Sequence, residues 1–460
     1  MRKRKKILSV VKSVDKILRF CYNAFMSLTQ FSDFGTKLCG ESGILQLMDD
    51  LGKPLPKGMP SYQLGGGNPA QIPEVAAMYR AQMERILSDG TAFDDLIGRY
   101  DAPQGRTEFI EAVAAYLSKT YGWNIGAENV AITNGSQSAC FYLFNLFSGT
   151  FTDKSGAQKK KKLLFPLVPE YIGYADQGIE SGTFVSIPSH FETDDDHTFK
   201  YHVNFDLLEE YLRKHDDTGA MCVSRPTNPT GNVLTDEEIR RLSALAESYD
   251  IPLFVDNAYG LPWPDIIFTE NATPTWNEHI VLSMSLSKIG LPSLRTGIII
   301  AKKEIVTALG NLNAIAALTS GSVGQAIAAP LIRSGQLVET AKNVVRPFYK
   351  EKSDAAVGWI KKYFSDGDFA VHKNEGSIFL WILMNDLSVP TKEFYHILKA
   401  RGVIVVPGEY FFFGGTTDGS TPPLEQHPHY RKCLRLNYAR PAAEVEQGIR
   451  IIAEEYLRRK

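Results

Sequence analysis

The 460-residue sequence contains no apolar run that approaches the roughly 20 residues a membrane-spanning helix needs. It also has almost no excess of charge, because 50 lysines and arginines oppose 52 aspartates and glutamates. Proteins that bind nucleic acid usually carry a basic surplus. We therefore expect a soluble protein whose partner is a small molecule, with no membrane and no nucleic-acid partner.

Cysteine is scarce. The five cysteines are widely scattered and form no C-x-x-C pair; they are Cys21, Cys39, Cys140, Cys222 and Cys433. An odd number without close pairs argues against a disulfide framework. We therefore expect a reducing compartment and predict a cytoplasmic protein.

Several ligand-binding motifs are also missing. "GGGNPA" lacks the order G-x-G-x-x-G, and no G-K-[ST] occurs, which argues against a dinucleotide or P-loop site. His427, His429 and Cys433 gather in "HPHYRKC", but there is no second cluster and no H-E-x-x-H. We predict no metal site and expect the two histidines to lie in a solvated loop.

The first 25 residues differ in composition from the rest, since "RKRKK" precedes an amphipathic stretch. A cationic targeting or surface-binding helix is one interpretation. Lys12, Asp15 and Lys16 interrupt its apolar part, so it fits a cleaved signal peptide poorly. The other interpretation, which we favour, is a basic N-terminal extension over residues 1–27, outside the core fold, with Met26 as an alternative start.

Short apolar runs alternate with helical periodicity through the middle of the chain, which is typical of an α/β domain with a mainly parallel sheet. Strands are predicted at 129–135, 162–167, 219–226, 251–256, 280–285 and 296–301, and a buried helix follows the first of them. Thr235 and Glu238 form a capping box that predicts a helix to about residue 250. The lysine-rich stretch 152–162 is expected to be a solvated loop.

From about residue 330 the pattern changes to a long helix, followed by strands and a helix near 391–401. This pattern indicates a smaller α+β domain. We predict a large ligand-binding domain over residues 91–325 and a small domain built from residues 28–90 and 326–460.

Polar residues follow the predicted strands. "TNGSQSA" places Ser136 and Gln137 at a strand-to-helix turn, where free amides and the helix dipole favour a phosphate. Asp256 ends a buried strand, Tyr259 follows it, and Asn228 lies in the turn "PTNPTGN". Each could serve only as a cap or a turn residue. Because ligands bind at the carboxyl ends of parallel strands, we expect these side chains to meet.

"MSLSKIGLPSLRTG" adds two cations between apolar segments. An unpaired buried charge is costly, so Lys288 and Arg295 need an anionic or covalent partner. Burial lowers the pKa of a lysine, and the neutral amine can attack a carbonyl. Ser285, Ser287 and Arg295 offer hydrogen-bond donors to a phosphate dianion. Together with the acid, the phenol and the amide, these are the parts that pyridoxal phosphate (PLP) requires.

These motifs, in this order and spacing, resemble those of the class I aminotransferase family of fold-type I PLP-dependent enzymes. The likeness runs from about residue 28 to the C-terminus. It implies an α/β fold with a mainly parallel seven-stranded sheet in the large domain and a smaller α+β domain. Longer stretches, including "LGGGNPAQIPE", "YDAPQGRTE" and "FPLVPEYIGYAD", are similar to family members that use valine and pyruvate.

The resemblance also implies roles for single residues. Lys288 would hold PLP covalently and act as the catalytic base, Asp256 would pair with the ring nitrogen, and Asn228 and Tyr259 would hydrogen-bond the ring's phenolate oxygen. The phosphate would be held by Ser136, Gln137, Ser285, Ser287 and Arg295. Tyr171 would stack on the ring. Arg295 lies seven residues after Lys288, one fewer than in the commonest family pattern, which leaves the geometry of this turn open.

For the substrate, the resemblance implies that Arg435 clamps the α-carboxylate, with Gly67 and Asn228 beside it. Tyr100 would reach the phosphate of a neighbouring subunit, which implies a homodimer with shared sites. The implied reaction is ping-pong transamination of L-valine and pyruvate to 2-oxoisovalerate and L-alanine. Two alternatives stay open: another PLP reaction, such as C-S bond cleavage or broader aliphatic transamination, and a non-catalytic regulator with this fold.

Overall fold

The computed structural model describes residues 31–40, 42–52 and 60–460. The chain divides into two compact units, residues 1–41 and 42–460. The described part of the first unit contains the short helix α2 (Asp33–Leu38), whose N-cap Ser32 accepts a hydrogen bond from the Gly35 amide at 3.2 Å. The predicted basic extension, residues 1–27, lies outside the described residues.

The second unit contains an eight-stranded sheet with the order β2-β11-β10-β9-β8-β4-β3, and β5 also pairs with β4. The strands are β2 (Val130–Asn134), β3 (Gly149–Thr152), β4 (Gln158–Val168), β5 (Phe184–Pro188), β8 (Thr218–Ser224), β9 (Leu253–Asp256), β10 (Ile280–Ser285) and β11 (Thr296–Ile300). Strands β5, β4, β8, β9 and β10 run parallel, and β11 is antiparallel to both its neighbours. The predicted mainly parallel sheet is confirmed, and the antiparallel β3 extends it by one strand.

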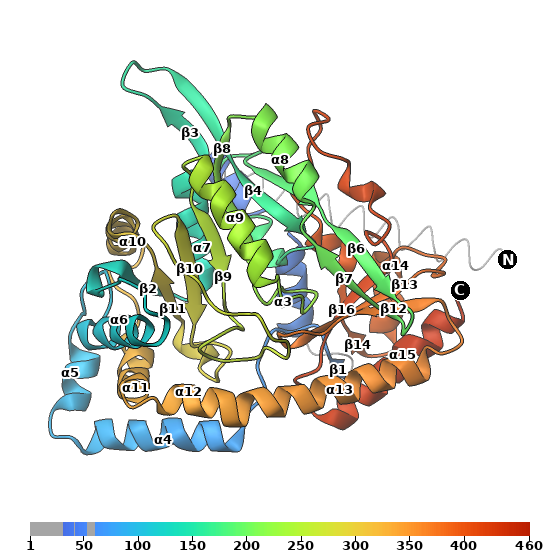
Figure 1. Cartoon of the computed structure of the whole chain (residues 1–460). Coiled ribbons are helices and arrows are strands. Elements are labelled where there is room, and N and C mark those ends of the chain that lie inside the picture. The colour runs from blue at the N-terminus through green and yellow to red at the C-terminus, as the bar shows by residue number, and fades with distance from the viewer. Residues whose placement is uncertain (1–30, 41, 53–59) are drawn as a thin grey trace. The chain divides into compact units, whose positions relative to one another are not determined.

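Helices cover both faces of the central part of this sheet, as its buried strands require. Every residue of β8, β10 and β11 is buried. Helix α7 (Ser136–Phe147) packs on one face and α9 (Asp236–Ser248) on the other (Figure 1). The predicted capping box is present at the start of α9: Thr235 Oγ1 accepts from the Glu238 amide at 3.1 Å, and Glu238 Oε2 accepts from the Thr235 amide at 2.8 Å.

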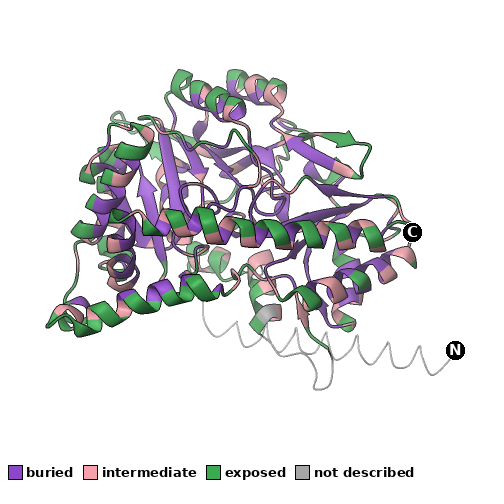
Figure 2. Ribbon diagram, turned by 60° about the horizontal axis from the view of Figure 1, so that its bottom comes forward, coloured by how far each residue is buried: buried purple, intermediate pink, exposed green. Residues whose placement is uncertain are grey.

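Further helices flank this sheet and the strands that follow. They are α3 (Gly43–Gly52), α4 (Pro73–Ser88), α5 (Ala92–Gly98), α6 (Thr107–Tyr121), α8 (Phe205–Lys214), α10 (Lys303–Ala316) and α11 (Ser322–Arg333). Helix α12 (Gln336–Thr340) continues through a π-helical turn, Ala341–Val345, into α13 (Arg346–Tyr363). The long helix predicted after residue 330 is therefore confirmed. Figure 2 shows α13 with its outer side exposed and buried strands behind it.

A second, six-stranded sheet has the order β15-β16-β13-β12-β7-β6. Its strands are β6 (His190–Asp194), β7 (Thr198–His202), β12 (Phe369–His372), β13 (Phe379–Met384), β15 (Val406–Pro407) and β16 (Cys433–Asn437). Short strands β1 (Tyr62–Gln63) and β14 (Val403–Ile404) pair with each other, and helices α14 (Thr391–Ala400) and α15 (Ala442–Leu457) complete the unit. The hairpin β6–β7 joins this sheet from the middle of the chain, through β12. The domain boundaries given above stay a prediction.

Two local predictions are wrong. Residues 158–162 are not loop: they begin β4 and pair with β3 in the register Gly149↔Lys161, although their side chains are largely exposed. His429 is not solvated: it is buried, its Nδ1 lies 2.6 Å from the Tyr201 hydroxyl, and its ring centroid lies 4.1 Å from that of Phe191. In both cases the partner strands, rather than the local sequence, decide the outcome.

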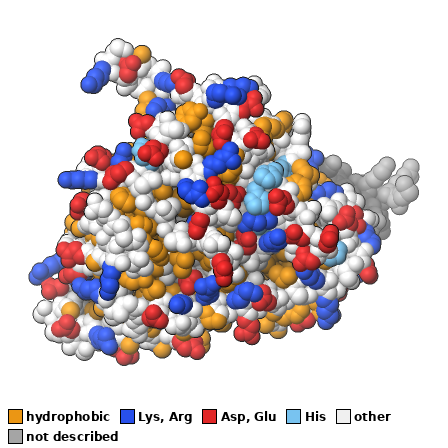
Figure 3. Space-filling model, in the orientation of Figure 1, with side chains coloured by type: hydrophobic (Ala, Val, Ile, Leu, Met, Phe, Trp, Pro, Cys, Tyr) orange, Lys and Arg blue, Asp and Glu red, His pale blue; other side chains and the backbone are white. Residues whose placement is uncertain are grey.

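The surface mixes both signs of charge. On the face in Figure 3, lysines and arginines alternate with aspartates and glutamates, as the formal net charge of -2 suggests. Within residues 31–40, 42–52 and 60–460, no helix has both the length and the apolar content to span a bilayer. Among the same residues, no group of three or more His, Cys, Asp or Glu is placed to hold a metal ion.

Candidate active site

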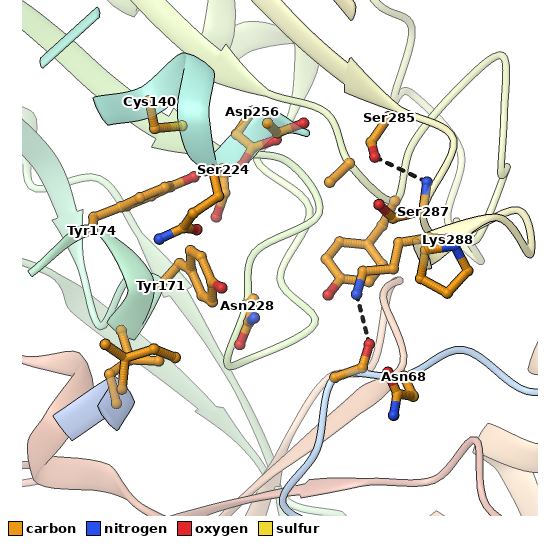
Figure 4. A pocket seen from close by; sticks show the side chains of 18 of the residues that line it. Asn68, Cys140, Tyr171, Tyr174, Ser224, Asn228, Asp256, Ser285, Ser287 and Lys288 are labelled. Carbon is orange, nitrogen blue, oxygen red and sulfur yellow. Dashed lines mark hydrogen bonds between the residues drawn. The ribbon is translucent and has the colours of Figure 1, made fainter. Parts of the chain in front are cut away.

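A cavity of about 490 Å³ opens at the carboxyl ends of the parallel strands. Every residue that the sequence assigned to a site lines this cavity except Tyr100: they are Gly67, Ser136, Gln137, Tyr171, Asn228, Asp256, Tyr259, Ser285, Ser287, Lys288, Arg295 and Arg435. Figure 4 shows Tyr171, Ser224 and Asp256 on one side of the space and Ser285, Ser287 and Lys288 on the other. The structure thus brings these predicted side chains together around one cavity.

Lys288 follows β10 and reaches across the cavity. Its Nζ donates a hydrogen bond to Gly67 O at 2.6 Å and lies 5.5 Å from the ring centroid of Tyr259. Burial, helped by the charges of Arg435 and Arg295, lowers the pKa of Lys288 to about 8, and Asp256 opposes part of this effect. About a tenth of the amine is therefore neutral at pH 7, far more than for an exposed lysine, and can act as a nucleophile or base.

Asp256 ends β9 at the bottom of the cavity. Its Oδ2 accepts a hydrogen bond from the Tyr174 hydroxyl at 2.6 Å. Its Oδ1 is buried and has no hydrogen-bond partner among the described residues. Burial raises the pKa of Asp256, while the Tyr174 hydroxyl and the Lys288 charge oppose that rise. An unsatisfied buried carboxylate oxygen calls for a donor, and the protonated ring nitrogen of PLP is a donor of the right chemistry.

The start of α7 forms a cradle with Arg295. Gly135 has φ +83°, and a Cβ there would lie 2.2 Å from Arg295 Nη2, so glycine lets the guanidinium lie against the helix start. Arg295 itself adopts a left-handed conformation, φ 48° and ψ 53°, after the turn Pro292–Leu294. This conformation resolves the turn geometry that the seven-residue spacing left open. The helix dipole, the free backbone amides and the guanidinium together favour the binding of a phosphate dianion.

The side chains of this cradle form hydrogen bonds within the protein. Ser285 Oγ accepts from the Ser287 amide at 2.9 Å, and Ser136 Oγ donates to Met284 O at 3.2 Å. The Gln137 side chain donates to Gly173 O at 2.9 Å, so its backbone amide in the first turn of α7 is the group it offers to a phosphate.

Arg435 lies on β16 at the opposite end of the cavity and is buried. Its Nη1 donates to Asn228 Oδ1 and its Nη2 to Gly65 O, both at 2.7 Å. The guanidinium stacks 4.1 Å from the Phe379 ring centroid and 5.1 Å from that of Phe411. Burial lowers the pKa of Arg435 to about 10, so the group stays charged at neutral pH and can bind a carboxylate.

Tyr100 stands apart from this cavity. It is 82% exposed and lies in a separate groove with Ile97, Ala317 and residues 319–323. In a single chain it therefore does not meet the other predicted residues. Its role toward the phosphate of a neighbouring subunit stays a prediction.

Sequence reasoning missed part of the cavity wall. Tyr174, which holds Asp256, is the second tyrosine of "EYIGY", a stretch in which only Tyr171 was assigned a role. Ile44, Leu47 and Met48 of α3 line the side away from the sheet. Their spacing is that of one helix face, which could have predicted the helix but not what it covers.

Comparison with known proteins agrees with this geometry. The family profile described as "Aminotransferase class I and II" matches residues 69–452. The valine-pyruvate aminotransferase of Escherichia coli K12 is 47% identical over 92% of this chain and 97% of its own. Family members of this class use PLP, and the unsatisfied Asp256 oxygen, the cradle at Gly135 and the Lys288 amine fit that cofactor.

Two solved structures are similar over nearly their whole length. A putative amino-acid aminotransferase from Psychrobacter arcticum 273-4 has a TM-score of 0.88 and 40% identity, covering 94% of this chain and 99% of that one. The valine-pyruvate aminotransferase of Salmonella typhimurium LT2 has a TM-score of 0.79 and 45% identity, covering 90% and 99%. The chain belongs to the class I and II aminotransferase family of PLP-dependent enzymes.

Proposed function

We propose that this protein transfers the amino group of L-valine to pyruvate and releases 2-oxoisovalerate and L-alanine. The observation that carries the proposal is one cavity in which an amine, Lys288, and a carboxylate-binding guanidinium, Arg435, face an apolar wall from α3. The high identity to an enzyme named for this reaction supports it.

Bound PLP would supply an electron sink for negative charge on the substrate α-carbon. In this proposal Lys288 would hold the cofactor through its ε-amine, and Asp256 would pair with the ring nitrogen. The start of α7 and Arg295 would hold the phosphate. Tyr171 would stack on the ring, and Asn228 and Tyr259 would hydrogen-bond its phenolate oxygen.

The residues proposed to bind the substrate would act one after another. Arg435 binds the α-carboxylate bidentately, and its bonds to Asn228 and Gly65 fix the plane of the guanidinium. The Nζ of Lys288 would act as the base that takes the α-proton of the substrate and would later return a proton. Because valine and pyruvate both carry an α-carboxylate, the same arginine serves both halves of the reaction.

The α3 helix would receive the aliphatic side chain. Ile44, Leu47 and Met48 line the cavity, whereas Asp50 on the same helix accepts a hydrogen bond from Tyr395 and pairs with Lys399 Nζ at 2.6 Å. The polar side of α3 is thus attached to α14 while its apolar side covers the site. An apolar wall favours an isopropyl group and penalises a charged side chain.

We further propose a homodimer with shared sites in the cytoplasm. The groove around Tyr100 adjoins exposed apolar side chains, including Ile97, Ile315 and Leu318, which a second copy would cover. The cysteines of the described residues are all free, in keeping with a reducing compartment.

The test is a half-reaction panel on the PLP-loaded protein. L-Valine should convert the cofactor to its pyridoxamine form, and added pyruvate should restore it with one L-alanine formed per 2-oxoisovalerate. Lys288→Ala should do neither. Pyruvate release from cystathionine, without amino transfer, would instead support a C-S lyase, and no turnover with any amino acid would support a regulator.

A further inference from the structure

Glu170 is a buried carboxyl group directly behind the cavity. It has no exposed surface, and its amide donates to Phe411 O at 3.0 Å. Its Oε1 accepts from the Tyr171 amide at 2.8 Å, and its Oε2 accepts from the Ser224 amide at 2.9 Å. Oε1 is also hydrogen-bonded to Ser224 Oγ. One carboxyl group therefore joins the chain after β4 to the end of β8.

Both segments that Glu170 joins contribute to the cavity wall. Tyr171 and Ser224 line the cavity, and they lie on the same side of it as Asp256 (Figure 4). Asn228, which holds Arg435, follows Ser224 by four residues. A displacement of Glu170 would therefore shift the residues that contact the cofactor ring and, through Asn228, the substrate arginine.

The surroundings of Glu170 disfavour a negative charge. The ionisable groups that face it are Asp256 on β9, Tyr174, Cys140 on α7 and Cys222 on β8, and each of these becomes harder to ionise when Glu170 is charged. Burial raises the pKa of Glu170 to about 8, although its hydrogen bonds from Ser224 and Tyr171 oppose the rise. Burial therefore favours the protonated form of this carboxyl at neutral pH.

We propose that Glu170 is a positioning residue that works as the neutral acid: it holds Tyr171 and Ser224 in place and leaves the charge behind the ring nitrogen to Asp256. In this form its O–H donates to Ser224 Oγ, and its two oxygens still accept from the amides of Tyr171 and Ser224. The inference rests on the proposed function of the cavity as a PLP site.

The proposal predicts different outcomes for two substitutions of Glu170. Glu170→Gln keeps the shape and the neutral charge of the acid. With its amide nitrogen toward Ser224 Oγ it keeps the acceptor for the Ser224 amide and loses the one for the Tyr171 amide, whereas Glu170→Ala removes both acceptors. At neutral pH, kcat for valine should fall about tenfold or more in E170A, with part of the loss restored in E170Q. Above pH 8 the wild-type cofactor absorbance should shift, because a second carboxylate then lies near Asp256. E170Q should lack this shift.

A readout without cofactor tests the protonation directly. Infrared difference spectra of the cofactor-free protein should show the carbonyl stretch of a protonated buried carboxyl at neutral pH, lost above pH 8 and absent from E170Q. Absence of that band in the wild type, or an E170Q protein as impaired as E170A, would overturn the proposal. If E170Q does not fold, Ser224→Ala is the second test. It should shift the carbonyl band, because it removes the hydroxyl that is hydrogen-bonded to the Glu170 carboxyl, and a band that does not shift would also overturn the proposal. A wild type that shows the band but no amino transfer would refute the proposed function alone.

Discussion

Replacing Leu47 with alanine should reduce the use of valine more than the use of alanine as amino donor. Leu47 lines the cavity from α3, and its Cδ1 would lie 3.4 Å from a methyl group placed on Gly65, whose carbonyl accepts from Arg435. Leu47 therefore lies next to the residue whose carbonyl holds Arg435. In the proposed reaction both donors would use the same Arg435 and Lys288, so their comparison isolates the side-chain contact.

The expected size of the effect follows from the apolar surface that the valine side chain buries. Valine has two more side-chain carbons than alanine, and each buried methylene stabilises by about 0.8 kcal/mol. Full burial of the isopropyl group would thus favour valine by about 1.6 kcal/mol, or roughly 15-fold in kcat/KM. Leu47 is one of three apolar side chains on this wall of α3, so its equal share is about 0.5 kcal/mol and its truncation should lower the preference for valine about 2.5-fold.

The assay is the single-turnover conversion of the PLP-loaded protein by each amino acid, followed by cofactor absorbance. Leu45→Ala is the matched control, because Leu45 is on the same helix, is 52% exposed and does not line the cavity. It should leave both rates within about twofold of the wild type. Equal losses for valine and alanine in Leu47→Ala would refute the side-chain role of α3, as would an unchanged ratio.

Three further predictions address the rest of the site. In the cofactor-free protein, the rate at which Lys288 reacts with PLP should rise about tenfold per pH unit below pH 8 and level off above it, because only the neutral amine attacks. The rate can be followed by stopped-flow absorbance, and a rate that does not change with pH would contradict this reasoning. Gly135→Ala should weaken PLP binding about tenfold, since its Cβ would displace the Arg295 guanidinium and the backbone there has φ +83°; a titration with unchanged affinity would count against the cradle. Co-refolded Tyr100→Ala and Lys288→Ala subunits, each impaired alone, should regain about a quarter of the wild-type sites if Tyr100 acts across a dimer; no regain would place its role within one chain.

Several of the predicted residues that line the cavity lie at the ends of strands of one parallel sheet. Asp256 ends β9, while Asn228 and Lys288 follow β8 and β10, and the carboxyl ends of parallel strands necessarily meet at one edge. Apolar runs mark these strands clearly, because both faces of the sheet are covered. Local pattern and global topology therefore agree, and the meeting of these side chains at one cavity could be predicted.

The residues that sequence reasoning missed depend on contacts between distant segments. Glu170 accepts from Ser224, 54 positions away, and a single glutamate in a loop otherwise predicts an exposed side chain. Asp50 meets Lys399 across 349 positions. Likewise, the exposed lysines at the start of β4 carry no alternating pattern, so only pairing with β3 reveals the strand.

The bonds of Arg435 have a consequence for synthesis of the protein on the ribosome. This one side chain joins β16 to Asn228 in the middle of the chain and to Gly65 near its beginning. The residues proposed to bind the cofactor, up to Arg295, leave the ribosome well before residue 435 does. If the proposed roles hold, a nascent chain therefore lacks the arginine proposed to bind the amino acid until translation is nearly complete, and its ability to bind substrate is acquired late.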